Sequence, residues 1–277
     1  MTKILCIGDW GEYFSEDMKM TIDKQYYDMI FLLGDNFYPD GIKKYKDNNW
    51  NKLYYNFPKN IIKYVVLGNH DYIGNIHYQL MKTFSSNYFS WYLPHFFYDI
   101  KDENNSVHYI YIDTQLLSLF YTSNMLSSSN VEEKYLQKFF KLYDIYHLEQ
   151  KKWLENTLEK SSFKWKIICG HYPIISGGPH QHVNELSEYL EPLLYKYNVD
   201  LYVSGHDHNS QLLKKNNTLF AVCGGSTQQY KTETINETIY QNSNKSLMEL
   251  NITKDKLEIY NIENNLKKII YCKKKII

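Results

Sequence analysis

The chain has 277 residues, enough for one large domain or two small ones, and enough to bury most of its apolar surface without disulfides. Lysine plus arginine and aspartate plus glutamate each number 31, so the formal net charge is zero. This balance gives no electrostatic reason to expect a nucleic acid or an anionic membrane as partner, and no apolar stretch approaches the length of a membrane span.

Three buried strands, separated by helices, are predicted in the first seventy residues. The strands are short apolar runs at 3–7, 29–33 and 61–67, and helical spacing appears at 15–25 and 43–57. Strand–helix units in series favour parallel pairing and an α/β fold. Each strand ends at a glycine followed by polar side chains, in the sequences Gly8-Asp9, Gly34-Asp35 and Gly68-Asn69-His70.

The middle of the chain has a different pattern. A short helix is expected at 77–84, and apolar runs at 96–100 and 107–112 flank a polar turn, which predicts an antiparallel hairpin. The serine-rich stretch 118–130 is predicted to be a mobile loop. Two helices are expected after it, at 132–146 and 147–161.

The second half returns to strands that end in polar turns. Runs at 165–169 and 200–203 precede Gly170-His171 and Gly205-His206-Asp207-His208, and a helix is expected at 184–197. Further short strands are predicted at 211–214, 218–223, 246–251 and 256–262. The lysine-rich end is expected to be a solvated tail. We therefore expect a single domain over 1–277, with a core at 3–262 and a tail at 263–277.

Polar side chains of metal-binding type follow all five strand ends. They are Asp9, Asp35, Tyr38, Asn69, His70, His171, His206 and His208. Each of them alone could be a turn, cap or core residue, but five matched strand ends are hard to explain as independent caps. Two metals about 3.5–4 Å apart need a bridging carboxylate, which Asp9 or Asp35 could supply. Mixed histidine and carboxylate ligands suit zinc, iron or manganese, and a phenolate favours a trivalent ion.

The order of the motifs GDWG, GDNFY, GNHD, GHYP and GHDHN resembles the calcineurin-like metallophosphoesterases. More narrowly, it is similar to the small purple acid phosphatases of the tartrate-resistant type. Most of the superfamily has a histidine two residues after the first aspartate, where this chain has Gly11, and Tyr38 takes its place as in the purple acid phosphatases. The resemblance implies a four-layer α/β/β/α sandwich of two mixed sheets flanked by helices.

The resemblance also implies two metal positions that share Asp35 as a bridge. Fe(III) would be held by Asp9, Asp35, Tyr38 and His208. A divalent ion, which could be iron, zinc or manganese, would be held by Asp35, Asn69, His171 and His206. His70 matches the histidine that contacts the substrate phosphate and assists the leaving group. A second substrate-facing histidine is His180 or His182, and we favour His180.

The implied function is an acid phosphatase that hydrolyses phosphomonoesters by attack of hydroxide bound at the metals, with His70 as the acid. The substrate would be a small molecule or a phosphoprotein, and we expect a monomer. With no secretory signal visible, we expect a cytoplasmic protein, although a secreted or vacuolar one stays possible. Alternatives are a phosphodiesterase or nucleotide phosphatase on the same fold, or a non-catalytic binding protein. The segment 114–147, in the position of the family's loop over the site, is expected to shape substrate access.

Overall fold

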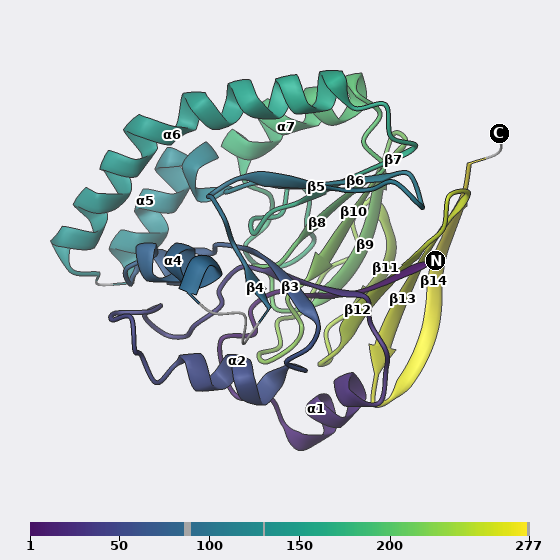
Figure 1. The fold of residues 1–277 in the computed structure, drawn as a ribbon. Helices are drawn as coiled ribbons and strands as arrows, with labels where there is room; N and C mark the ends of the chain where they lie inside the picture. Colours follow the sequence, from purple (N-terminus) through teal and green to yellow (C-terminus); the bar gives the residue numbers. More distant parts are fainter. Residues whose placement is uncertain (86–89, 130, 276–277) are drawn as a thin grey trace.

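The computed structural model describes residues 1–85, 90–129 and 131–275. Within these ranges the strands form two mixed sheets that pack face to face, with helices on the outer faces (Figure 1). In that view the helices α6 and α7 lie above one sheet, and α1 and α2 lie below the other. The predicted sandwich of two mixed sheets flanked by helices is therefore confirmed.

The first sheet has the order β14-β13-β12-β1-β2-β3-β4. Neighbouring strands from β1 to β4 are parallel, whereas β12 joins β1 in antiparallel orientation and continues as a meander through β13 and β14. The carboxyl ends of β1, β2 and β3 therefore meet at one edge. The bounds are β1 Thr2–Ile7, β2 Met29–Leu33, β3 Ile62–Val66, β4 Trp91–Tyr92, β12 Leu247–Ile252, β13 Lys256–Glu263 and β14 Leu266–Lys274.

The second sheet has the order β11-β9-β10-β8-β7-β6-β5. Its centre is parallel from β6 through β7 and β8 to β10, and the predicted hairpin is confirmed as the antiparallel pair β5–β6. The bounds are β5 Tyr98–Asp102, β6 Val107–Tyr111, β7 Trp165–Cys169, β8 Leu201–Ser204, β9 Ser210–Lys215, β10 Thr218–Cys223 and β11 Thr238–Asn242.

Aromatic side chains pack between the two sheets. The ring of Phe31, on β2, lies 5.4 Å from the rings of both Tyr109 and Tyr111, on β6, in edge-to-face geometry. All three side chains are buried. Because strands covered on both faces must be apolar on both sides, this packing explains the unbroken apolar runs in the sequence.

The helices connect the strands and cover the sheets. In the described residues, no helix is long and apolar enough to cross a membrane. Their bounds are α1 Glu16–Asp23, α2 Trp50–Asn56, α3 Asn69–Tyr72, α4 His77–Ser85, α5 Leu119–Ser128, α6 Glu133–Lys160 and α7 Asn184–Lys196, with a 3₁₀ turn η1 at Gln115–Leu117.

The prediction of a mobile loop at 118–130 was wrong, because helix α5 occupies 119–128; residue 130 lies outside the described residues. The carboxylate of Glu185, on α7, accepts hydrogen bonds from the backbone N–H groups of Phe120 and Tyr121 in the first turn of α5. Leu126 is buried. Tertiary contacts therefore fix a helix that its serine content argued against.

Other boundaries also differ from the prediction. The helices expected at 132–146 and 147–161 are one helix, α6, because no glycine or proline interrupts the sequence between them. Only 50–56 of the helix expected at 43–57 forms, since the Asp47 side chain accepts hydrogen bonds from the backbone N–H groups of Lys43 and Asn49 in a preceding turn.

The predicted lysine-rich tail also required correction. Strand β14 lies within it and pairs with β13 along its length. Lys267 forms an ion pair with buried Glu249, and Lys273 forms one with Asp200. Two lysines of this strand thus neutralise buried carboxylates.

Two leucines of α6 provide a test of the packing. Leu154 is fully buried and Leu148 is 67 % exposed. We expect Leu154→Ala to lower the free energy of unfolding by about 2–5 kcal/mol, because it leaves a cavity in the core. The same substitution at Leu148 should change it by less than about 0.5 kcal/mol. Urea denaturation measures both, and equal losses would contradict the packing described for α6.

Candidate metal centre

The five polar turns lie at the carboxyl ends of β1, β2, β3, β7 and β8, where the edges of the two sheets meet. All the predicted metal ligands are buried there: Asp9, Asp35, Tyr38, Asn69, His171, His206 and His208. Topology alone explains their convergence, because parallel strands end at the same edge and open α/β sheets build their sites at that edge.

Three of these residues have a left-handed backbone. The φ angles are +57° at Asp9, +51° at Asp35 and +71° at His206. Such conformations cost about 1–3 kcal/mol each and concentrate at functional sites. In each turn the left-handed residue directly follows a glycine, so the chain reverses sharply at the strand end. The left-handed residue is itself the predicted ligand.

The first ligand cluster surrounds the hydroxyl of Tyr38. Its Oη atom lies 3.1 Å from Asp9 Oδ1, from Asp35 Oδ2 and from His208 Nε2. His208 Nε2 is also 3.4 Å from Asp9 Oδ1. Two carboxylates, a phenol and an imidazole therefore converge on one point, which is the set predicted for Fe(III).

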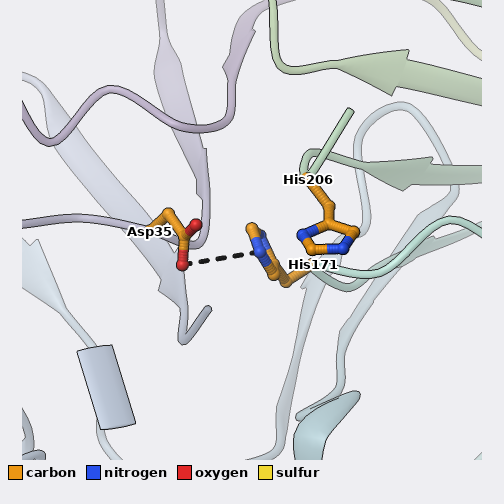
Figure 2. A group of neighbouring side chains, drawn as sticks. All are labelled: Asp35, His171 and His206. Atoms are coloured by element: carbon orange, nitrogen blue, oxygen red, sulfur yellow. Dashed lines mark ion pairs between the residues drawn. The ribbon is translucent and has the colours of Figure 1, made fainter. Parts of the chain in front are cut away.

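The second cluster lies on the other side of Asp35. Ligand atoms of Asp35, His171 and His206 all lie within 4.8 Å of one another (Figure 2). His171 Nε2 is 3.1 Å from Asn69 Oδ1 and 3.5 Å from Asp35 Oδ1. Asp35 thus presents Oδ2 to the first cluster and Oδ1 to the second, which is the geometry a bridging carboxylate requires.

The hydrogen bonds of His171 show that the second cluster fits a cation. Its Nδ1 lies 2.8 Å from the Leu33 carbonyl oxygen, which can only accept, so Nδ1 carries the proton. The Nε2 lone pair of a neutral ring then faces the Asn69 and Asp35 oxygens, which are also acceptors. A metal ion between these three atoms would satisfy all of them.

Electrostatics at the first cluster also fit a cation. Asp9 and Asp35 are almost completely buried, and such carboxylates need a compensating positive charge. Burial, with the Asp35 and Asp9 carboxylates, raises the pKa of Tyr38 well above its ordinary value. A strongly charged cation would be needed to hold this residue as a phenolate.

A buried carboxylate that the sequence analysis left unassigned ties three of the motifs together. Asp71 accepts hydrogen bonds from Gly68 N, Asn36 Nδ2 and Gln79 Nε2 at 2.8–2.9 Å. Asn36 Oδ1 in turn accepts from the indole N–H of Trp10. The position of Asp71 next to His70 was the available signal, and its role is to fix the turn that carries Asn69.

The cavity beside the clusters has a volume of about 760 Å³. His70 and His180 line it, and the His180 ring stacks on His206 at 4.3 Å. His182 is exposed and lines a different cavity. The structure therefore brings His180, and not His182, to the predicted metal ligands. The remaining lining residues include Glu12, Tyr13, Lys52, Met125, Gln228 and Tyr230.

Two tyrosines contact predicted ligands without having been predicted. Tyr230 stacks on His208, with ring centroids 4.4 Å apart and planes 3° from parallel. The hydroxyl of Tyr121, on α5, lies 2.8 Å from His206 Nε2. The sequence holds 28 tyrosines and gives no signal that would single these two out.

With this geometry in place, comparison with known proteins identifies the family. The model of the calcineurin-like phosphoesterases matches residues 2–210, about three quarters of the chain. The chain belongs to this family. The family and the ligand set together support a phosphoesterase with a dinuclear metal centre.

Relatives with similar sequences are purple acid phosphatases. Purple acid phosphatase 7 of Arabidopsis thaliana is 29 % identical over 247 residues, which cover 82 % of this chain and 70 % of the relative. Tartrate-resistant acid phosphatase type 5 of Oryctolagus cuniculus is 29 % identical over 244 residues, which cover 80 % of this chain and 72 % of the relative.

Solved structures share the fold. The Plasmodium protein GAP50, described as the anchor in the inner membrane complex, superposes with a TM-score of 0.79 at 22 % identity and covers 99 % of this chain and 88 % of its own. A purple acid phosphatase from yellow lupin gives a TM-score of 0.67 at 14 % identity, over 98 % of this chain and 53 % of its own. At these identities the likeness shows the fold alone.

Gly68 tests the geometry of the bridge. A Cβ atom at this position would lie 2.2 Å from the backbone nitrogen and from Oδ1 of Asp35, so Gly68→Ala must displace the Asp35 carboxylate, the predicted bridge. We expect about ten- to hundredfold weaker metal binding, measured by metal analysis after dialysis against a chelator. Gly225→Ala, where Cβ would meet no heavy atom closer than 3.3 Å, should retain its metal. Equal metal content in both variants would contradict the bridging role of Asp35.

Proposed function

We propose that the protein is an acid phosphatase of the purple type, which hydrolyses phosphomonoesters at a centre of Fe(III) and a divalent ion. The observation that carries the proposal is the position of Tyr38. Its hydroxyl lies 3.1 Å from a ligand atom of each of Asp9, Asp35 and His208. Gly11 stands where most of the superfamily has a histidine, and this leaves the position to a phenol. A phenolate among carboxylates suits a trivalent ion, and the similar purple acid phosphatases support this assignment.

The protein supplies positions and a proton to this reaction. When bound, the two cations supply charge that offsets the phosphate and lowers the pKa of water. Asp35 would hold both cations, through Oδ2 on one side and Oδ1 on the other, and Asn69 would hold the divalent one. His70 Nδ1 lies 2.6 Å from the Pro39 carbonyl oxygen and therefore carries a proton. Its Nε2, 4.0 Å from Asp35 Oδ2, is then the atom that holds the proton for the leaving group.

Two histidines of the cavity support a phosphate ester as substrate. His70 and His180 line the same cavity, His70 from the end of β3 and His180 from the loop after β7. A phosphate between them would have one imidazole on each side.

The anchor role named for GAP50 is an alternative on this fold, but the complete set of buried ligands in this chain favours catalysis. Assays with aryl monoesters and diesters separate the phosphomonoesterase from the phosphodiesterase alternative.

The decisive experiment is metal analysis combined with a visible spectrum. We expect the purified, oxidised protein to contain iron and to show a tyrosinate-to-iron absorption band. Tyr38→Phe should abolish the band, because it removes the phenolate and leaves the ring. Tyr230→Phe, which alters a tyrosine stacked on His208, is the matched control and should keep the band. A colourless, iron-free and active protein would refute the Fe(III) assignment.

The pH dependence of turnover tests the role of His70. Burial lowers the pKa of His70, but the Asp35 carboxylate and the Pro39 carbonyl raise it by more, so the net shift is upward. Cations bound at the Asp35 carboxylate would oppose this upward shift. At whatever pH the His70 ring then titrates, activity that needs this proton is lost as the pH rises through its pKa. We expect His70→Asn to lower kcat by about 10²–10⁴ and to remove this alkaline limb.

The leaving group provides the control for His70. Alkyl phosphates release a basic alkoxide that needs a proton, whereas nitrophenyl phosphate releases a stable phenolate. The loss in His70→Asn should therefore be larger for alkyl than for nitrophenyl esters, in profiles of kcat/KM against pH. An unchanged alkaline limb, or equal losses on both substrates, would exclude His70 as the acid.

A further inference from the structure

Helix α5 reaches the predicted centre through one side chain. The hydroxyl of Tyr121 lies 2.8 Å from His206 Nε2. The bond occupies the nitrogen that points away from the other ligands, and Figure 2 shows a nitrogen of His206 directed toward His171 and Asp35. Since Nε2 is engaged by Tyr121, Nδ1 is the atom left to bind a divalent ion.

Metal binding through Nδ1 imposes a condition on the other side of the ring. The neutral imidazole must carry its proton on Nε2, and this N–H needs an acceptor because His206 is 2 % exposed. Tyr121 Oη is placed to accept it. A ring rotated by half a turn would lose this bond and direct carbon atoms to the metal position.

The packing around Tyr121 holds its hydroxyl at this position. Its ring packs on that of Tyr172 with centroids 4.9 Å apart in edge-to-face geometry. Its backbone N–H donates to Glu185 Oε2 at 2.9 Å, which ties the first turn of α5 to α7. One turn further along, Met125 lines the cavity. Helix α5 is thus both a wall of the cavity and the support of a ligand.

We propose that Tyr121 is a positioning residue, which orients His206 with Nδ1 toward the divalent metal and accepts the proton of Nε2. The inference rests on the proposed function, because it concerns the divalent position of the same centre. It gives α5 a role at the centre, although this helix lies outside the five ligand motifs. Tyr121 acts through His206 and contacts neither substrate nor metal itself.

The test is the affinity of the divalent position in Tyr121→Phe. This variant keeps the ring against Tyr172 and removes only the acceptor. We expect zinc binding, measured by calorimetric titration of protein that holds iron alone, to weaken about tenfold or more. The tyrosinate band of the iron position should be unchanged, and so should the thermal unfolding midpoint of the metal-free protein.

Tyr189→Phe is the matched control, because it also removes one tyrosine hydroxyl. The hydroxyl of Tyr189, on α7, donates a hydrogen bond to the Lys151 carbonyl oxygen, on α6. This variant should bind zinc as the unaltered protein does. Equal zinc affinity in Tyr121→Phe overturns the positioning role and leaves the phosphatase proposal intact. Loss of the iron band or of metal-free stability in Tyr121→Phe also overturns it, in favour of a general structural role. If the unaltered protein binds no metal, both proposals fall together.

Discussion

Two hydrogen bonds that cross between the sheets set the geometry on which the site depends. Asp9, after β1, accepts from the backbone N–H of His206, after β8, at 2.7 Å. In return His171, after β7, donates to the carbonyl of Leu33, at the end of β2. Each bond joins a ligand of one sheet to the backbone of the other. The spacing of the two ligand clusters is therefore fixed by how the sheets pack, and burial strengthens both bonds by excluding water.

The motif residues could be predicted from the sequence because their chemistry demands particular side chains at strand ends, and parallel strands bring those ends together. Asp35 and Tyr38 are of this kind. The residues and strands that support the motif residues from elsewhere in the chain could not be predicted. Tyr121 is one tyrosine among 28, and only the tertiary position of α5 brings it to His206. Strand β14 was missed because its lysines suggest solvent, whereas Asp200, the partner of Lys273, lies 73 residues away in the sequence.

The site is supported in different ways on its two sides. On the side of the first sheet, Asp71, Asn36 and Trp10 form a buried network that fixes the turns of β1, β2 and β3 to one another. On the other side, His180 sits on a loop whose backbone is held by Asp207. The predicted ligands of the first sheet thus belong to a hydrogen-bonded framework, while His180, the proposed substrate-facing histidine, lies on a loop. Loops on a fixed scaffold are where related enzymes commonly differ in substrate.

The left-handed turns at Asp9 and Asp35 have an evolutionary consequence. Asparagine tolerates that backbone about as well as aspartate, whereas most other residues do not. The substitutions that the backbone accepts most readily at these positions are therefore those that remove a negative charge from the metal centre and leave the turn in place. A descendant of such a chain could lose its chemistry by a single substitution and keep its architecture. Members of this fold that serve only as scaffolds would then be a short mutational distance from the enzymes.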